Sequence, residues 1–232
     1  MVINMKNTPN SNYHEQINAK NILHLRELLS KLPSFCNDYF LGNAQLLSSR
    51  TKIAYAFDLK VFFDYIHDSK KGYENIDINE FKIGILDEIT RTDLLQFLDY
   101  LSLYEKDGKI IKNDERGKSR KLATLKSFYN YYFCNELIKT NPAALISMPK
   151  LHEKEIIRLD INEVAELLDL IENGEKLTDG EKRFFSKNGL RDFTMFTLML
   201  GTGIRVSECV GLNIEDLDLE NQRLKVRRKG GN

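Results

Sequence analysis

The sequence predicts a mainly α-helical protein in which a helical first domain is followed by a smaller α+β domain. Apolar residues recur at helical spacing through the first part of the chain. A segment at 141–154 holds two of the four prolines and separates the two parts. Near the C-terminus, residues 215–229 alternate in character as a short β-hairpin does.

Composition sets the broad class of protein. The chain has 232 residues, of which 42% are hydrophobic, enough for one large domain or two small ones. It has no apolar run long enough to span a bilayer, and the N-terminus lacks the apolar core of a signal peptide. We therefore expect a cytoplasmic protein without a membrane partner.

The three cysteines, Cys36, Cys134 and Cys209, have no metal-ligand spacing. Each lies among apolar residues, which is typical of a buried, reduced thiol. We expect no metal site and no cofactor.

The N-terminal region predicts a tail and one short helix. Residues 1–20 are polar and lack periodicity, so they are expected to form a flexible tail. Residues 21–40 have leucines at 25, 28, 29 and 32 and predict a short amphipathic helix, interrupted near Pro33.

A second helix is expected from Ser48 or Ser49, either of which is a suitable N-cap, to a stop near Gly72. One stripe of this segment repeats at helical spacing and contains Thr51, Ala54, Tyr55, Asp58, Leu59, Phe62, Phe63 and Ile66. Residues 89–93 open a third helix, whose apolar residues are Leu94, Leu95, Phe97, Leu98 and Leu101. The charged, glycine-bearing stretch 105–117 predicts a loop.

A fourth helix is predicted over residues 119–137. Its expected buried face consists of Leu122, Leu125, Phe128, Tyr129, Tyr132 and Phe133. Asn141-Pro142 ends this region, because a residue before proline avoids the helical conformation. We therefore place the helical domain at 21–145 and a linker at 146–154.

The segment 155–232 predicts the α+β domain. Asp160 with Glu163 has the spacing of a capping box, followed by a helix at 164–171. Residues 172–188 are polar and predict a loop or broken helix, and 191–200 are strongly apolar and helical. The hairpin at 215–229 is expected to turn at 220–222.

Charge is segregated along a chain whose formal net charge is zero. Residues 109–131 contain seven basic residues against Asp114 and Glu115, and residues 223–229 contain five basic residues and no acid. Such a distribution produces a local phosphate-binding surface on a neutral protein, or simply solvated helix faces. Charge alone leaves both interpretations open.

Two short runs have chemical significance. In GTGIRVSECVGL, residues 201–212, a glycine turn precedes Arg205 on the opening turn of a short helix, where an arginine is placed to hold a phosphate oxygen. In LKVRRKGGN, residues 224–232, an alternating strand ends in Lys229 beside two glycines, where a lysine is a mobile proton donor.

These runs resemble the first two active-site elements of the tyrosine recombinases, also called phage integrases. Residues 46–150 resemble the N-terminal core-binding domain of the Xer-type members, most specifically in RGKSRKLATLKSFYNYYFCNELIKTNPAALISMPK. There a basic helix start, an aromatic face and an Asn-Pro-Ala exit occur together in the family's order. Residues 155–232 resemble about the first half of the family's catalytic domain.

The resemblance implies a helical, SAM-like core-binding domain followed by the first half of an α+β catalytic domain. It implies that Arg205 is the first catalytic arginine, that Glu208 orients it, and that Lys229 is the catalytic lysine. The implied partner is double-stranded DNA, with self-association on DNA in a complete protein. The basic residues expected to line one concave DNA-binding surface are Arg50, Lys52, Arg116, Lys118, Arg120, Lys121 and Lys126.

The sequence also departs from the family. The family needs a downstream His-x-x-Arg, a further His or Trp and a nucleophilic tyrosine, but every histidine precedes Arg205 and no tyrosine follows Tyr132. Tyr129, Tyr131 and Tyr132 are interpreted as an aromatic helix face rather than as nucleophiles. We therefore expect a C-terminally truncated form that binds DNA without cleaving it, and the resemblance leaves open whether the chain is an enzyme.

Three functions remain in competition at the level of sequence. The first is a fragment of a site-specific recombinase, and the second is a non-enzymatic DNA-binding module that occupies sites or pairs with intact copies. The third is a helical interaction protein with a chance motif. The basic helix start at residues 116–121 argues against the third.

Overall fold

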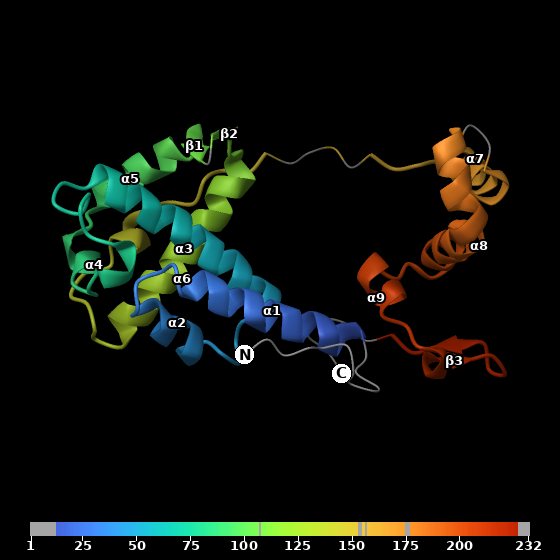
Figure 1. Cartoon of the computed structure of the whole chain (residues 1–232), viewed down its shortest axis with the longest axis horizontal. Helices are drawn as coiled ribbons and strands as arrows, with labels where there is room; N and C mark the ends of the chain where they lie inside the picture. The colour runs from blue at the N-terminus through green and yellow to red at the C-terminus, as the bar shows by residue number, and fades with distance from the viewer. Residues whose placement is uncertain (1–12, 107, 153–154, 156, 175–176, 227–232) are drawn as a thin grey trace. The chain divides into compact units, whose positions relative to one another are not determined.

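The structure is a computed structural model that describes residues 13–106, 108–152, 155, 157–174 and 177–226. The chain separates into two compact units, one of residues 15–153 and one that contains residues 154–232. Figure 1 shows helices α1 to α6 in the first, here called the helical unit, and α7 to α9 in the second, the C-terminal unit. The chain is therefore mainly α-helical, as predicted. None of the described helices has the length and apolarity needed to cross a bilayer.

The helical unit consists of helices and one small hairpin. The helices are α1 Tyr13–Leu29, α2 Cys36–Gly42, α3 Ser49–Ser69, α4 Ile85–Glu88, α5 Arg91–Tyr100 and α6 Glu115–Cys134. Strand β1, Tyr104–Lys106, pairs antiparallel with β2, Lys109–Ile111. Short 3₁₀ turns occupy Ile78–Glu80 and Pro142–Leu145.

Side-chain caps determine where the helices begin. The Ser48 hydroxyl accepts the Thr51 amide at 3.2 Å, which confirms Ser48 as the cap of α3. Thr90 and Asp93 form a reciprocal capping box at α5. Asp114 accepts the Gly117 amide at 2.8 Å, so α6 begins four residues before the predicted start at residue 119.

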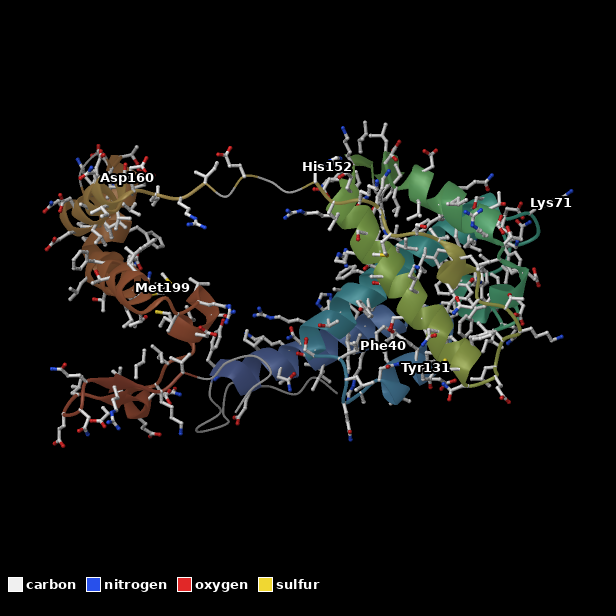
Figure 2. All side chains as sticks on the ribbon, turned by 180° about the vertical axis from the view of Figure 1, so that it is seen from behind. Phe40, Lys71, Tyr131, His152, Asp160 and Met199 are labelled. Carbon is white, nitrogen blue, oxygen red and sulfur yellow. The ribbon has the colours of Figure 1, made fainter. Side chains whose placement is uncertain are left out.

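An aromatic core holds the helical unit together. Phe62 and Phe63 of α3 and Phe128 of α6 are fully buried, and each such ring contributes about 1.5–3 kcal/mol by leaving water. The Tyr132 hydroxyl donates to the Phe35 carbonyl at 2.5 Å. Tyr129 is also buried, so the aromatic helix face is confirmed, whereas Phe133 is 45% exposed and lies outside it. Tyr131, seen on α6 in Figure 2, is only partly buried.

Helix α1 begins at Tyr13, inside the stretch that the sequence predicted to be a tail. Helix propagation explains the difference, because a turn that is fixed by tertiary contacts adds further residues without a new nucleation cost. The Asn21 amide donates to the Ser49 hydroxyl at 3.1 Å, and Leu28 is buried in the core of the helical unit.

The stretch 105–117 forms the β1–β2 hairpin and the start of α6 rather than a loop. Buried Tyr104 anchors β1, and Lys106 pairs with Asp64 of α3 at 2.9 Å. Gly108 has a φ of 71°, a left-handed conformation that the turn requires and that glycine adopts without strain. The strands are three residues long, too short for a pattern to be recognised in sequence.

The segment after Asn141 belongs in part to the helical unit. Ala143 and Ile146 belong to its core and Pro142 is buried beside them, so the stretch 141–146 packs against helices instead of bridging two units. All members of this core cluster lie between Leu28 and Ile146.

The C-terminal unit contains α7 Ile161–Asn173, α8 Asp179–Thr202, α9 Val206–Val210, the 3₁₀ turn Ile214–Asp216, and strands β3 Leu217–Asp218 and β4 Arg223–Leu224. The predicted capping box is confirmed, because Asp160 accepts the Glu163 amide and Glu163 accepts the Asp160 amide. Residues 172–188 were expected to form a loop or a broken helix, and the second alternative agrees with the structure, because α7 ends at Asn173 and α8 begins at Asp179. Helix α8 opens with a second box made by Thr178 and Glu181.

The C-terminal unit has little buried apolar surface. Among its described residues, Ile204 and Cys209 are the buried hydrophobic side chains, whereas Phe184 is 72% exposed and Leu190 82% exposed. The expectation of a buried thiol holds for Cys36 and Cys209 and is wrong for Cys134, which is exposed near the end of α6.

Candidate phosphate site and nucleic-acid interface

Arg205 stands at the junction of α8 and α9, as the sequence predicted. Helix α8 ends at Gly203, whose φ of 69° is left-handed and whose amide donates to the Met199 carbonyl at 2.8 Å. The chain then turns, and Arg205 is the N-cap residue of α9. The turn needs a residue without a Cβ penalty, which explains the glycine before the arginine.

Glu208 contacts Arg205 in two places. One carboxylate oxygen, Oε2, accepts the Arg205 backbone amide at 2.8 Å, and Oε1 accepts the guanidinium Nη1 at 2.9 Å. The Glu208 side chain is 7% exposed and that of Arg205 is 74% exposed. A buried carboxylate thus holds one edge of a guanidinium that is otherwise open to solvent, and an open guanidinium matches the geometry of a phosphate.

The predicted catalytic lysine lies outside the described residues. The hairpin that leads toward it is formed by β3 and β4, with Leu217 opposite Leu224 and Asp218 opposite Arg223. Asp218 accepts from the Asn221 amide at 3.0 Å and from its side chain at 2.8 Å, which places the turn at the predicted position. The described chain ends at Val226, before Lys229.

The basic residues of the helical unit differ in what they contact. Arg50 of α3 and Arg116 of α6 are exposed, and neither forms a hydrogen bond or ion pair with another described residue. Lys52 donates to the Ala44 carbonyl at 2.8 Å, and Lys118 donates to the Ser102 hydroxyl at 2.5 Å. Lys126 is partly buried on α6.

Lys121 is turned inward and is only 7% exposed. Its ammonium donates to Asn113 Oδ1 at 2.8 Å and lies 3.8 Å from Asp58 Oδ1. Burial lowers the pKa of Lys121 more than the attraction of Asp58 raises it. This side chain therefore does not extend toward a ligand, contrary to the expectation that it lines an exposed basic surface.

Asp58 was not among the predicted site residues. It is 2% exposed on α3, and its Oδ2 accepts from Arg120 Nη1 at 2.5 Å and from the Thr124 hydroxyl at 2.8 Å. The sequence did contain a signal, because Asp58 lies on the apolar stripe of the predicted helix. A carboxylate on a buried face requires a cationic partner from another element.

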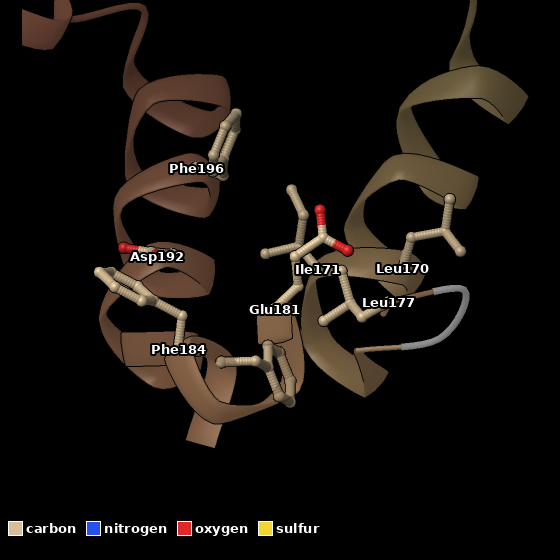
Figure 3. Close-up of a pocket in the computed structure, with 9 residues that line it drawn as sticks. Leu170, Ile171, Leu177, Glu181, Phe184, Asp192 and Phe196 are labelled. Carbon is tan, nitrogen blue, oxygen red and sulfur yellow. The ribbon is translucent and has the colours of Figure 1, made fainter. Parts of the chain in front are cut away.

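A cavity of about 600 Å³ lies between α7 and α8. Figure 3 shows its mainly apolar lining, with Leu170 and Ile171 from α7 and Phe184 and Phe196 from α8. Its two acids serve the helix itself, since Glu181 caps α8 and Asp192 pairs with Arg191 at 2.7 Å. The lining has the character of incompletely filled core rather than of a catalytic site.

Comparison with known proteins gives the same family from both parts of the chain. The family model of the phage integrases matches residues 158–232. Two relatives are named tyrosine recombinase XerC: that of Caldanaerobacter subterraneus subsp. tengcongensis is 29% identical over 207 residues, and that of Leptospira interrogans serovar copenhageni is 30% identical over 184. Tyrosine recombinase XerS of Streptococcus uberis is 28% identical over 231 residues.

The alignments cover most of this chain but only part of each relative. They include 86%, 79% and 89% of the chain, against 52%, 50% and 64% of the respective relatives. The chain thus spans about half the length of the first two. No solved structure gives a significant match. The matched residues include both the helical unit and the Arg205 site, and the chain therefore belongs to the tyrosine recombinases, or phage integrases, of the Xer type.

Proposed function

We propose that this protein takes part in site-specific DNA recombination, in which DNA strands are broken and rejoined through a phosphotyrosine intermediate. The observation that carries the proposal is the Arg205–Glu208 pair at the start of α9, within the part of the chain that the family model matches. The exposed guanidinium is the group that binds phosphate, and the scissile DNA phosphate is its proposed ligand.

Arg205 acts on the transition state of phosphoryl transfer. When an attacking tyrosine adds to the phosphate, negative charge grows on the non-bridging oxygens, and a guanidinium that bridges two of them stabilises the transition state more than the ground state. Glu208 orients the guanidinium, and its two hydrogen bonds to Arg205 support this role. Lys229, which follows β4 in the sequence, donates the proton to the leaving 5′ oxygen as general acid.

The helical unit is the part that binds double-stranded DNA. The side chains proposed for this role are Arg50, Lys52, Arg116, Lys118, Arg120 and Lys126. Exposure supports Arg50 and Arg116 most directly, and Arg120 keeps 48% of its side chain exposed. Lys121 is excluded from this set, because its buried ammonium balances the negative charge of Asp58. Binding through phosphates is independent of sequence and falls steeply with salt.

The proposed domain boundaries separate the part that binds DNA from the part that contains the Arg205 site. The predicted core-binding domain, 21–145, is extended to include all of α1 from Tyr13 and the buried Ile146; the linker then runs to residue 154, and 155–232 form part of the catalytic domain. The separate compactness of residues 15–153 supports the division. Since the substrate is genomic DNA, we place the protein in the cytoplasm, with self-association on DNA in the complete protein.

The 232-residue chain alone is proposed to bind DNA without cleaving it. None of its tyrosines follows Tyr132, and Tyr129 and Tyr132 are buried in the helical unit, where burial raises their pKa and keeps them from a phosphate. This supports the second function considered above, a non-enzymatic DNA-binding module, for the chain in isolation.

Two assays test these proposals. In gel shifts at several salt concentrations, the chain should bind duplex DNA, and the double substitution of Arg50 and Arg116 by glutamine should lower the salt dependence by about two phosphate contacts. A nicked suicide substrate should give no covalent band with the 232-residue chain. Where the reading frame continues past the Asn232 codon, the longer form should give the band and its Arg205→Ala variant should not. A covalent band from the 232-residue chain would overturn the assignment of the nucleophile.

A further inference from the structure

Asp58, Arg120, Thr124 and Lys121 form one charged cluster between α3 and α6. Asp58 Oδ2 accepts from Arg120 Nη1 at 2.5 Å and from Thr124 Oγ1 at 2.8 Å, while Lys121 lies 3.8 Å from Oδ1. The Thr124 hydroxyl also lies 3.2 Å from the Arg120 carbonyl, one turn back on α6. Oδ2 therefore has two hydrogen-bond donors, and Oδ1 faces the ammonium of Lys121.

The members of the cluster differ in how far their side chains are exposed to solvent. The side chains of Asp58 and Lys121 are 2% and 9% exposed, whereas that of Arg120 is 48% exposed. Two cations face one carboxylate, so the cluster retains one net positive charge, and Arg120 is the member through which that charge reaches solvent. The group that this arrangement suits is an anion that binds the outer edge of the guanidinium.

The cluster is not explained by stability. Burial raises the pKa of Asp58 despite the attraction of Arg120 and Lys121 and the hydrogen bond from Thr124, so its ionised form is disfavoured by folding. Buried ion pairs often contribute less to stability than apolar residues of similar volume. A free arginine, by contrast, loses side-chain entropy when it binds a phosphate, and a carboxylate that holds one of its nitrogens removes part of that cost beforehand.

We propose that Asp58 is a positioning residue that presents the Arg120 guanidinium to a phosphate of the DNA backbone, with Thr124 and Lys121 holding Asp58 in place. This inference rests on the proposed function, because the phosphate is that of the DNA bound by the helical unit. It adds a residue that never contacts DNA to the determinants of DNA affinity.

The substitution Asp58→Asn separates positioning from simple electrostatics. It removes a negative charge beside a cationic surface, so an acid that only repels DNA would give tighter binding when it is replaced. A positioning residue gives the opposite sign. We expect Asp58→Asn to weaken binding of a fluorescein-labelled duplex of arbitrary sequence by roughly tenfold, the effect of one charge-assisted hydrogen bond.

Asp64 supplies the matched control on the same helix. It is a carboxylate that pairs with two cations, Lys60 at 2.8 Å and Lys106 at 2.9 Å, and neither lysine is part of the proposed DNA surface. The same change of charge at Asp64→Asn is expected to leave binding unchanged or slightly tighter. Thermal melts by circular dichroism verify that each variant is folded at the temperature of the binding assay.

A double-mutant cycle decides whether Asp58 acts through Arg120. Arg120→Gln should weaken binding and lower the salt slope by about one, and Asp58→Asn added to it should cause no further loss. If Asp58→Asn does not fold, Thr124→Val replaces it, because this change keeps all charges and removes one bond to Asp58. Weaker binding by Thr124→Val supports the proposal, and unchanged binding overturns it.

The outcomes separate this inference from the proposed function. Unchanged or tighter binding by folded Asp58→Asn overturns the positioning role alone, as does a further loss in the double variant. Failure of the parent chain to bind duplex DNA at low salt overturns the proposed function, and the inference with it.

Discussion

Glu208 accepts both the backbone amide and the guanidinium of Arg205, at 2.8 and 2.9 Å. One carboxylate therefore caps α9 and orients the arginine, so the local fold and the proposed chemistry depend on the same side chain. The pairing follows from helical geometry, because residues three apart at a helix start lie within reach of each other.

Replacement of Glu208 by alanine should release both groups. We expect a loss of about 1–3 kcal/mol in local stability, since a buried carboxylate and two hydrogen bonds are removed. Amide hydrogen exchange at residues 205–209 measures the effect. Glu208→Gln retains acceptor capacity for one bond and should lie between the parent chain and the alanine variant. Equal protection in all three proteins would show that Glu208 does not hold α9.

Two glycines at the end of α8 should respond to alanine with opposite signs. Gly203 has a φ of 69°, so Gly203→Ala should destabilise the chain by about 1 kcal/mol through backbone strain. Gly201 lies inside α8, and a Cβ added at either position meets nothing within 4 Å. Gly201→Ala should therefore stabilise by about 0.5–1 kcal/mol. Urea unfolding of the two variants checks the signs, and a gain in stability from Gly203→Ala would contradict the argument.

The Tyr132 hydroxyl provides a test of the aromatic core. Its removal in Tyr132→Phe leaves the buried Phe35 carbonyl without that donor, and we expect a loss of about 1–2 kcal/mol in the free energy of unfolding. Tyr131→Phe is the control, because the Tyr131 hydroxyl donates to no described residue. Chemical denaturation followed by circular dichroism compares them, and equal losses would argue against the specific bond.

Stability should depend on pH through Asp58. Burial raises its pKa above the ordinary value of 3.8, so the folded state binds the proton more tightly than the unfolded state. The stabilisation is complete below the unfolded pKa and is lost as the pH rises through the folded pKa. The free energy of unfolding of the parent chain, relative to Asp58→Asn, should therefore be greater near pH 4 than near pH 7. Urea titrations at both pH values measure it, and the reverse trend would indicate a lowered pKa.

Local signals in the sequence were sufficient for three helix starts and for the Arg205 turn, whereas the starts of α1 and α6 differ from the prediction. Ser48, Thr90 and Asp160 cap helices where the pattern placed them, since a cap requires contacts only within four residues. The same is true of Gly203 and Arg205, whose conformations are set by the adjoining helices. The resemblance to the tyrosine recombinases could also be identified from the sequence alone, because it rests on such local motifs.

Tertiary structure alone decided which charged side chains are buried. Lys121 and Arg120 are neighbours in one basic run, yet the first faces Asp58 from inside and the second is half-exposed. The difference arises because α3 packs against α6 with an acid on its buried face, and this contact joins residues 62 positions apart. For the same reason the three-residue strands of the β1–β2 hairpin depend on a long-range partner, Asp64 of α3, whose contribution no local pattern encodes.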